Sequence, residues 1–107
     1  MYVINRRSLP STRYEGARHG PATVSILFSE SEPGDGPRLH RHPYDETWIV
    51  QEGRVQVWIG EETGEASAGD IVVAPPYTPH KFKNIGEGLA TLICIHASPT
   101  VSTEWLE

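Results

Sequence analysis

Apolar and polar residues alternate along most of the chain, and the apolar runs are short. Residues 54–59 show the pattern clearly, because Val55, Val57 and Ile59 alternate with larger or polar neighbours. Successive side chains of a strand leave opposite faces, so a period of two predicts strands rather than helices. We predict strands over 22–28, 38–42, 45–51, 54–59, 63–68, 70–74, 80–84 and 89–97, with 101–106 as a candidate edge strand.

Turn-forming residues separate these segments. The 10 Gly and 9 Pro are spread between the apolar runs, and no linker or internal repeat is visible. Short Gly-containing connections such as Glu52-Gly53 join neighbouring strands as tight turns. Eight or more short strands at this spacing predict an all-β fold, either an antiparallel sandwich or a closed barrel.

The length fits one domain, since 107 residues form one small core. Within the single domain over 1–107 we expect an N-terminal strand or arm over 1–21, a barrel over 22–97 and a C-terminal tail over 98–107. Residues 6–21 show no clear periodicity. We expect this segment to lie on the barrel or on a partner subunit.

Charge and composition narrow the partners. The formal net charge is -5 and no basic cluster exceeds the pair Arg6-Arg7, so no nucleic-acid partner is expected. No apolar stretch approaches the roughly 20 residues of a membrane span, and none near the start has signal-peptide length. We therefore expect no membrane partner and a cytoplasmic location. Cys94, the only cysteine, excludes an intramolecular disulfide and is expected to behave as a small buried hydrophobe.

The segment around residues 40–46 holds the candidate chemistry. His40 and His42 stand two positions apart, so on a strand their imidazoles leave the same face. Glu46 has the same parity and joins them after a turn at Pro43-Tyr44, and His80 lies in a second patterned segment. Two histidines and one carboxylate on one face can form a divalent transition-metal site.

These residues also fall at the spacing of two motifs, through which the chain resembles the cupin family. The first motif is a Gly, five residues, His-x-His, three residues, Glu, six residues and a Gly. The second is a Gly, five residues, Pro-x-Gly, two residues, His, three residues and an Asn. The matching positions are Gly34, His40, His42, Glu46 and Gly53 for the first, and Gly69, Pro75, His80 and Asn84 for the second. Tyr77 stands where the second motif has glycine.

The resemblance implies a double-stranded β-helix, or cupin barrel, of antiparallel strands. It also implies one divalent transition metal held by His40, His42, Glu46 and His80. Such a ligand set accepts Fe, Mn, Zn, Ni or Cu, and it leaves coordination positions open for substrate or O₂.

Two further residues are candidates for catalysis. Arg38 shares the parity of His40 and His42, and inside the barrel it would hold a substrate carboxylate or phosphate. The alternative is an arginine at the strand edge that reaches solvent or a partner. Tyr77 either takes an ordinary turn conformation or brings an aromatic ring to the mouth, where it would donate a proton or gate access. Packing of its ring on the neighbouring prolines is the simpler alternative.

Other residues receive structural interpretations. We expect Trp48 to pack the barrel interior. His96, late in an apolar strand, is interpreted as a structural histidine rather than a fifth ligand. The pattern leaves open which faces of 54–59 and 89–97 line the cavity, and it assigns no role to His19.

Apolar residues occupy more strand positions than one inner face needs, and such outward rows favour an interface. Since small cupins usually pair two barrels, we predict a homodimer. The function expected from the resemblance is a metal-dependent enzyme on a small organic molecule, with anionic molecules among the candidates. It would be a dioxygenase or a Lewis-acid isomerase or decarboxylase. The alternatives are a non-catalytic small-molecule-binding or sensor module and a barrel whose metal is purely structural.

Overall fold

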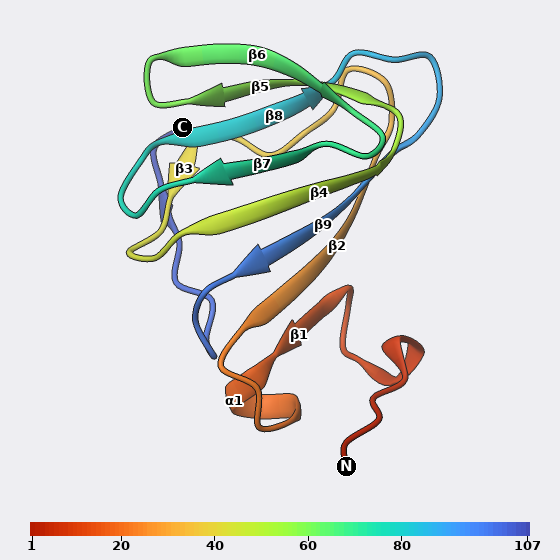
Figure 1. Ribbon diagram of the computed structural model, residues 1–107, viewed down its shortest axis with the longest axis vertical. Helices are drawn as coiled ribbons and strands as arrows, with labels where there is room; N and C mark the ends of the chain where they lie inside the picture. Colours follow the sequence, from red (N-terminus) through yellow and green to blue (C-terminus); the bar gives the residue numbers. More distant parts are fainter.

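The computed structural model describes residues 1–107 as two five-stranded antiparallel sheets packed on each other (Figure 1). The strand orders are β1-β2-β9-β4-β7 in one sheet and β10-β3-β8-β5-β6 in the other. The elements are η1 (Arg6–Ser8), β1 (Arg13–Glu15), α1 (Gly16–His19), β2 (Ser25–Ser31), β3 (His40–Arg41), β4 (Glu46–Glu52), β5 (Arg54–Ile59), β6 (Glu62–Ser67), β7 (Ile71–Ala74), β8 (His80–Asn84), β9 (Ala90–His96) and β10 (Glu104–Trp105). The predicted all-β class is confirmed.

Most strand boundaries agree with the hydrophobic pattern. The strands predicted at 54–59 and 80–84 coincide with β5 and β8. By contrast, β2 starts and ends three residues later than predicted, because it stays paired with β9 as far as Ser31 and Ala90. The strand predicted over 38–42 is reduced to β3, and it pairs with β8 through His40 and His80.

The N-terminal segment contains a strand that its sequence pattern does not predict. Three residues are too few to show a period of two, yet Arg13–Glu15 form β1 along the edge of β2. Figure 1 shows β1, α1 and η1 together at one end of the molecule, with the C-terminus near β3 at the other. The segment therefore lies partly on its own barrel. Neither helix has the length or apolar content that a membrane-crossing segment needs, and the cytoplasmic location stays a prediction.

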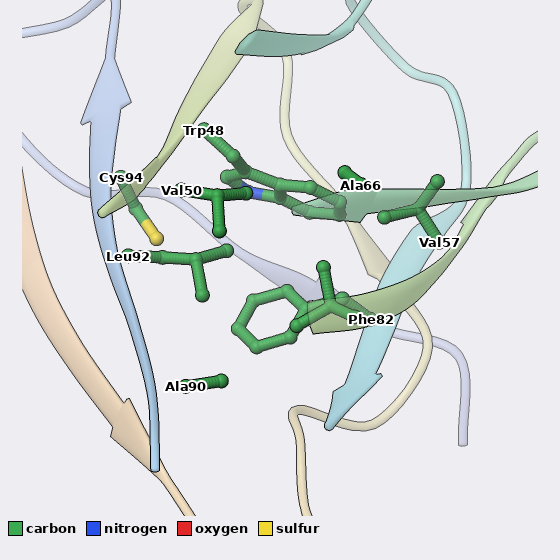
Figure 2. Packing of buried hydrophobic residues seen from close by; sticks show 9 residues of the cluster. Trp48, Val50, Val57, Ala66, Phe82, Ala90, Leu92 and Cys94 are labelled. Atoms are coloured by element: carbon green, nitrogen blue, oxygen red, sulfur yellow. The ribbon is translucent and has the colours of Figure 1, made fainter. Parts of the chain in front are cut away.

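The core lies between the two sheets. Figure 2 shows side chains from β4 and β9 meeting others from β5, β6 and β8. The cluster consists of Trp48, Val50, Val55, Val57, Ala66, Phe82, Ala90, Leu92 and Cys94. The sequence did not show which faces of strands 54–59 and 89–97 point inward. In the structure, the valines of β5 and the even-numbered residues of β9 do so. Gln56 and Trp58 point outward.

Trp48 links this core to the polar end of the barrel, and its predicted interior position is confirmed by an exposure of 1%. Its ring meets Phe82 in the core at 5.1 Å between centroids. On the other side it meets His80 at 5.5 Å. The apolar packing of one end thus supports the candidate metal-binding residues at the other.

Candidate metal centre

Strand pairing brings four side chains distant in sequence to one end of the barrel. His40 lies on β3, His42 directly after it, and Glu46 and His80 are the first residues of β4 and β8. Antiparallel pairing places His40 directly opposite His80. One ligand atom from each of the four lies within 4.8 Å of those of the others. All four are buried, with exposures between 1% and 7%, so the structure assembles the predicted set in one place.

Backbone carbonyls orient the three imidazoles. The Nδ1 of His40 donates to the carbonyl of Arg38 at 2.6 Å. In the same way His42 donates to Ser102 at 2.8 Å and His80 to Thr78 at 2.8 Å. Since a carbonyl oxygen only accepts, each Nδ1 carries hydrogen. The Nε2 of each ring is therefore the nitrogen available to a metal, as in many protein sites where the other nitrogen is fixed by a hydrogen bond.

Glu46 supplies the negative charge of the cluster. Its Oε1 lies 3.0 Å from the Nε2 of His42 and 2.9 Å from the Nε2 of His80. Burial acts to raise the pKa of Glu46, but the surrounding imidazoles of His42, His80 and His96 outweigh it and hold the pKa well below its usual range. Burial lowers the pKa of His40, which favours its neutral form. An ionised carboxylate beside neutral imidazoles is a suitable donor set for a divalent transition metal.

The cluster opens into a cavity of about 420 Å³. Leu27, Trp48 and Phe82 contribute apolar wall, and the C-terminal segment contributes Trp105. The charged residues that are exposed along the lining are mostly acidic, since Glu30, Glu32 and Asp35 outnumber the single arginine, Arg13. The volume suits a small organic molecule.

Arg38 does not point into this cavity. Its side chain is exposed, and its guanidinium lies 5.0 Å from the centre of the Trp105 ring on the outside. The parity argument fails here because β3 begins only at His40, so the alternation of a strand does not extend back to Arg38. The residue contributes to the site through its backbone carbonyl, which holds His40.

Tyr77 also contributes through its backbone rather than its ring. Its φ of 59° lies in the left-handed region, so it does not take an ordinary turn conformation. The family glycine is replaced at a position where glycine is the favoured residue. The side chain is 63% exposed and does not line the cavity, while its N–H donates to the carbonyl of His42 at 2.7 Å.

Sequence reasoning missed Tyr44 and treated His96 as a structural residue. His96, the last residue of β9, pairs with Glu46 across the sheet and lines the cavity. Its Nδ1 lies 2.7 Å from the hydroxyl of Tyr44, but its Nε2 has no hydrogen-bond partner. Only one of the two ring nitrogens of His96 thus has a hydrogen-bond partner. In the sequence, residues 90, 92, 94 and 96 fall on one face of the strand, which could have indicated that His96 points inward. Nothing in the sequence around Tyr44, which lies in a turn, indicated its contact with His96.

Cys94 matches its predicted role as a small buried side chain. It belongs to the core cluster and is unpaired. Burial raises the pKa of its thiol, and the nearby Glu46 carboxylate raises it further. Because the reactive form of cysteine is the thiolate, this environment keeps Cys94 unreactive.

Residues 27–96, most of the barrel, match the family described as the cupin domain. The chain belongs to the cupin family. It is 34% identical over 97 residues to protein MJ1618 of Methanocaldococcus jannaschii, and the match covers 90% of this chain and 74% of that one.

Solved cupin structures agree with the fold. A Klebsiella pneumoniae protein with a double-stranded β-helix domain has a TM-score of 0.73 and 24% identity, over 79% of this chain and 76% of that chain. The oxalate decarboxylase of Lactobacillus farciminis, solved as a formate complex, has a TM-score of 0.78 and 26% identity. That match covers 88% of this cupin but 30% of the decarboxylase. The barrel is therefore a double-stranded β-helix, as the sequence motifs imply.

Proposed function

We propose that this cupin is a metal-dependent enzyme that acts on a small organic molecule. One divalent transition metal would be held by the Nε2 atoms of His40, His42 and His80 and by Glu46. The observation that carries the proposal is the convergence of these four buried donors, with three Nδ1 atoms already bound to carbonyls. A bound metal would supply Lewis acidity or a site for O₂.

The surroundings of the cluster favour a bound organic molecule. A cavity of about 420 Å³ adjoins the donors, whereas a purely structural metal needs a closed shell of protein ligands. Leu27, Phe82 and Trp105 provide apolar contact for the carbon skeleton. Resemblance to an oxalate decarboxylase solved with formate supports action on a small organic molecule, and this chain matches 30% of that protein.

The charges of the exposed lining residues indicate which kind of small molecule the cavity would bind. Glu30, Glu32 and Asp35 bring three carboxylates to the cavity lining. Arg13 is the only arginine or lysine that lines the cavity. These negative carboxylates repel an approaching anion and attract a cation. With Arg38 outside the cavity, no second basic side chain helps to hold a carboxylate. Among small organic molecules we therefore favour a neutral or cationic one over the anionic candidates.

A non-catalytic binding or sensor module is the second candidate. It would use the same four donors and the same cavity. Turnover separates the two functions, since both need the metal and the cavity.

The test is a turnover assay of the protein loaded in turn with Fe(II), Mn(II), Ni(II) and Zn(II). Each form is incubated with a panel of small diketones, thiols, hydroxy acids and amines. O₂ uptake and product formation are recorded. We expect one metal form to consume one substrate class, with rates that fall to background in the His40→Ala/His42→Ala variant. His19→Ala, which changes a histidine outside the cavity, should keep the full rate.

Three results oppose the enzyme. Saturable ligand binding with no product from any metal form would establish the sensor module instead. Metal loading that raises the unfolding temperature while no molecule binds would establish a structural metal. A rate that survives in the His40→Ala/His42→Ala variant would place the activity elsewhere.

A further inference from the structure

His96 is the buried histidine that the metal cluster does not use. Its side chain is 2% exposed, and its Nε2 lacks a hydrogen-bond partner. This nitrogen lies 3.2 Å from Oε2 of Glu46, and the ring packs edge-on against His42 with 4.6 Å between centroids. Buried polar atoms without a partner are rare in folded proteins, so the position needs an explanation.

Tyr44 determines which nitrogen of His96 carries the proton. The N–H of Ser102 donates to the hydroxyl oxygen of Tyr44 at 3.1 Å, which leaves the single hydroxyl hydrogen for another acceptor. The Nδ1 of His42, 3.5 Å away, already donates to the carbonyl of Ser102 and cannot accept. The hydroxyl hydrogen therefore goes to Nδ1 of His96 at 2.7 Å. A neutral imidazole has one donor and one acceptor nitrogen, so Nε2 of His96 bears the proton.

This tautomer is the opposite of the one found in the three candidate ligands. His40, His42 and His80 carry hydrogen on Nδ1, bound to carbonyls, and keep Nε2 for a metal. His96 presents an N–H toward the cluster and so offers no lone pair there. Four histidines surround Glu46, but the hydrogen bonds divide them into three ligands and one donor.

The two oxygens of Glu46 face different neighbours. Oε1 lies on the side of His42 and His80. Oε2 lies on the side of His96, whose Nε2 is 3.2 Å away, and strand pairing places the two residues directly opposite each other on β4 and β9. A small rotation of the carboxylate or the imidazole would align the N–H with Oε2.

We propose that His96, held in this tautomer by Tyr44, is a positioning residue for Glu46. Its Nε2–H binds Oε2 and turns Oε1 toward the metal shared with His40, His42 and His80. Hydrogen bonds to the second oxygen of a metal-binding carboxylate fix its orientation and tune the metal. The inference rests on the proposed function, because it needs a metal at the cluster.

The test uses the full chain and Co(II), whose visible absorption reports coordination number and ligand set. Each variant is treated with chelator and titrated with Co(II) against a competing chelator, and its spectrum is recorded. The variants are His96→Leu, His96→Gln, which keeps an N–H near the position of Nε2, and Tyr44→Phe. Tyr14→Phe is the matched control, since it also removes one tyrosine hydroxyl, which here donates to the carbonyl of Gly20, and Tyr14 does not line the cavity.

We expect His96→Leu to bind one Co(II) per chain with an affinity lowered about 10- to 100-fold and a changed spectrum. His96→Gln should restore the spectrum and most of the affinity. Tyr44→Phe should shift the spectrum in the direction of His96→Leu, because the tautomer is no longer fixed. Tyr14→Phe should match the wild type. Thermal unfolding of the chelator-treated proteins shows that each variant is folded.

Other outcomes overturn the inference. Loss of Co(II) from His96→Leu as complete as from His40→Ala/His42→Ala would make His96 a ligand. Unchanged affinity and spectrum in His96→Leu and Tyr44→Phe would show that the pair has no positioning role. In both cases wild-type binding leaves the proposed metal centre intact. A wild-type protein that binds no Co(II) would instead contradict the proposed function itself.

Discussion

At the scale of single residues, the candidate centre is built as much by backbone as by side chains. Arg38, Thr78 and Ser102 each present a carbonyl to one histidine. The N–H of Tyr77 holds the carbonyl of His42. These contacts are made by main-chain groups that almost every residue type has, the N–H being absent only from proline, so no residue type in the sequence marks them. The motif spacing nevertheless predicted all four donors that the structure brings together.

Tyr77 gives a prediction about backbone strain. A non-glycine residue in the left-handed region is disfavoured, and the ring of Tyr77 is exposed, so its removal loses little packing. We expect Tyr77→Gly to be more stable than Tyr77→Ala by about 0.5–1 kcal/mol, the strain relieved less the chain entropy of glycine. Urea unfolding of both variants measures the difference. Equal stability, or a more stable alanine variant, would show that the position carries no strain.

At the scale of elements, hydrophobic periodicity predicted the strands that have an inner and an outer face, such as β5 and β9. It failed where an element is defined by its partner. β1 has three residues and β3 has two, and both exist through pairing with β2 and β8. The misplaced Arg38 follows directly from the overestimated length of β3.

The C-terminal segment 101–107 is an element whose importance the sequence did not show. β10 pairs with β3, the Ser102 carbonyl holds His42, and the Trp105 ring lies 5.0 Å from that of His40. Glu104 and Arg41 form a salt bridge at 2.8 Å on the outside. The segment therefore both lines the cavity and supports two candidate ligands.

Removal of residues 101–107 should weaken metal binding without removing a ligand. Loss of the support for His42 is expected to lower the Co(II) affinity about 10- to 100-fold. Removal of residues 1–3, which are exposed and outside the cavity, is the control and should leave the affinity unchanged. A competitive chelator titration measures both. Full affinity in the protein without 101–107 would contradict the supporting role.

At the scale of the whole molecule, the outer face of one sheet is largely apolar. On β2, β4, β7 and β9 the residues that alternate with the inward ones are mostly large and apolar. They are Ile26, Phe28, Ile49, Ile71, Val73, Ile93 and Ile95. Ile71 and Val73 are 66% and 51% exposed, whereas the other five are half-buried and the Arg6 guanidinium lies over the Phe28 ring. Apolar rows on a sheet surface favour association with another surface of the same kind.

We propose that this face joins two copies of the chain. Light scattering at micromolar concentration should give twice the mass of one chain. Ile93→Glu, in the middle of the face, should give a monomer because it places a charge in the interface. Gln56→Glu on the outer face of the other sheet should stay dimeric. A monomeric wild type, or an Ile93→Glu protein that remains dimeric, would contradict this arrangement.

The central claim is that three histidines and a glutamate form a metal centre, and the metal content of the protein tests it most directly. Elemental analysis of freshly purified protein should find close to one equivalent of a divalent transition metal per chain. The same analysis should find almost none in the His40→Ala/His42→Ala variant and the full amount in His19→Ala. A wild type free of transition metal that also takes up none from added Fe(II), Mn(II), Ni(II), Cu(II) or Zn(II) would contradict the account. So would a His40→Ala/His42→Ala variant that keeps its metal.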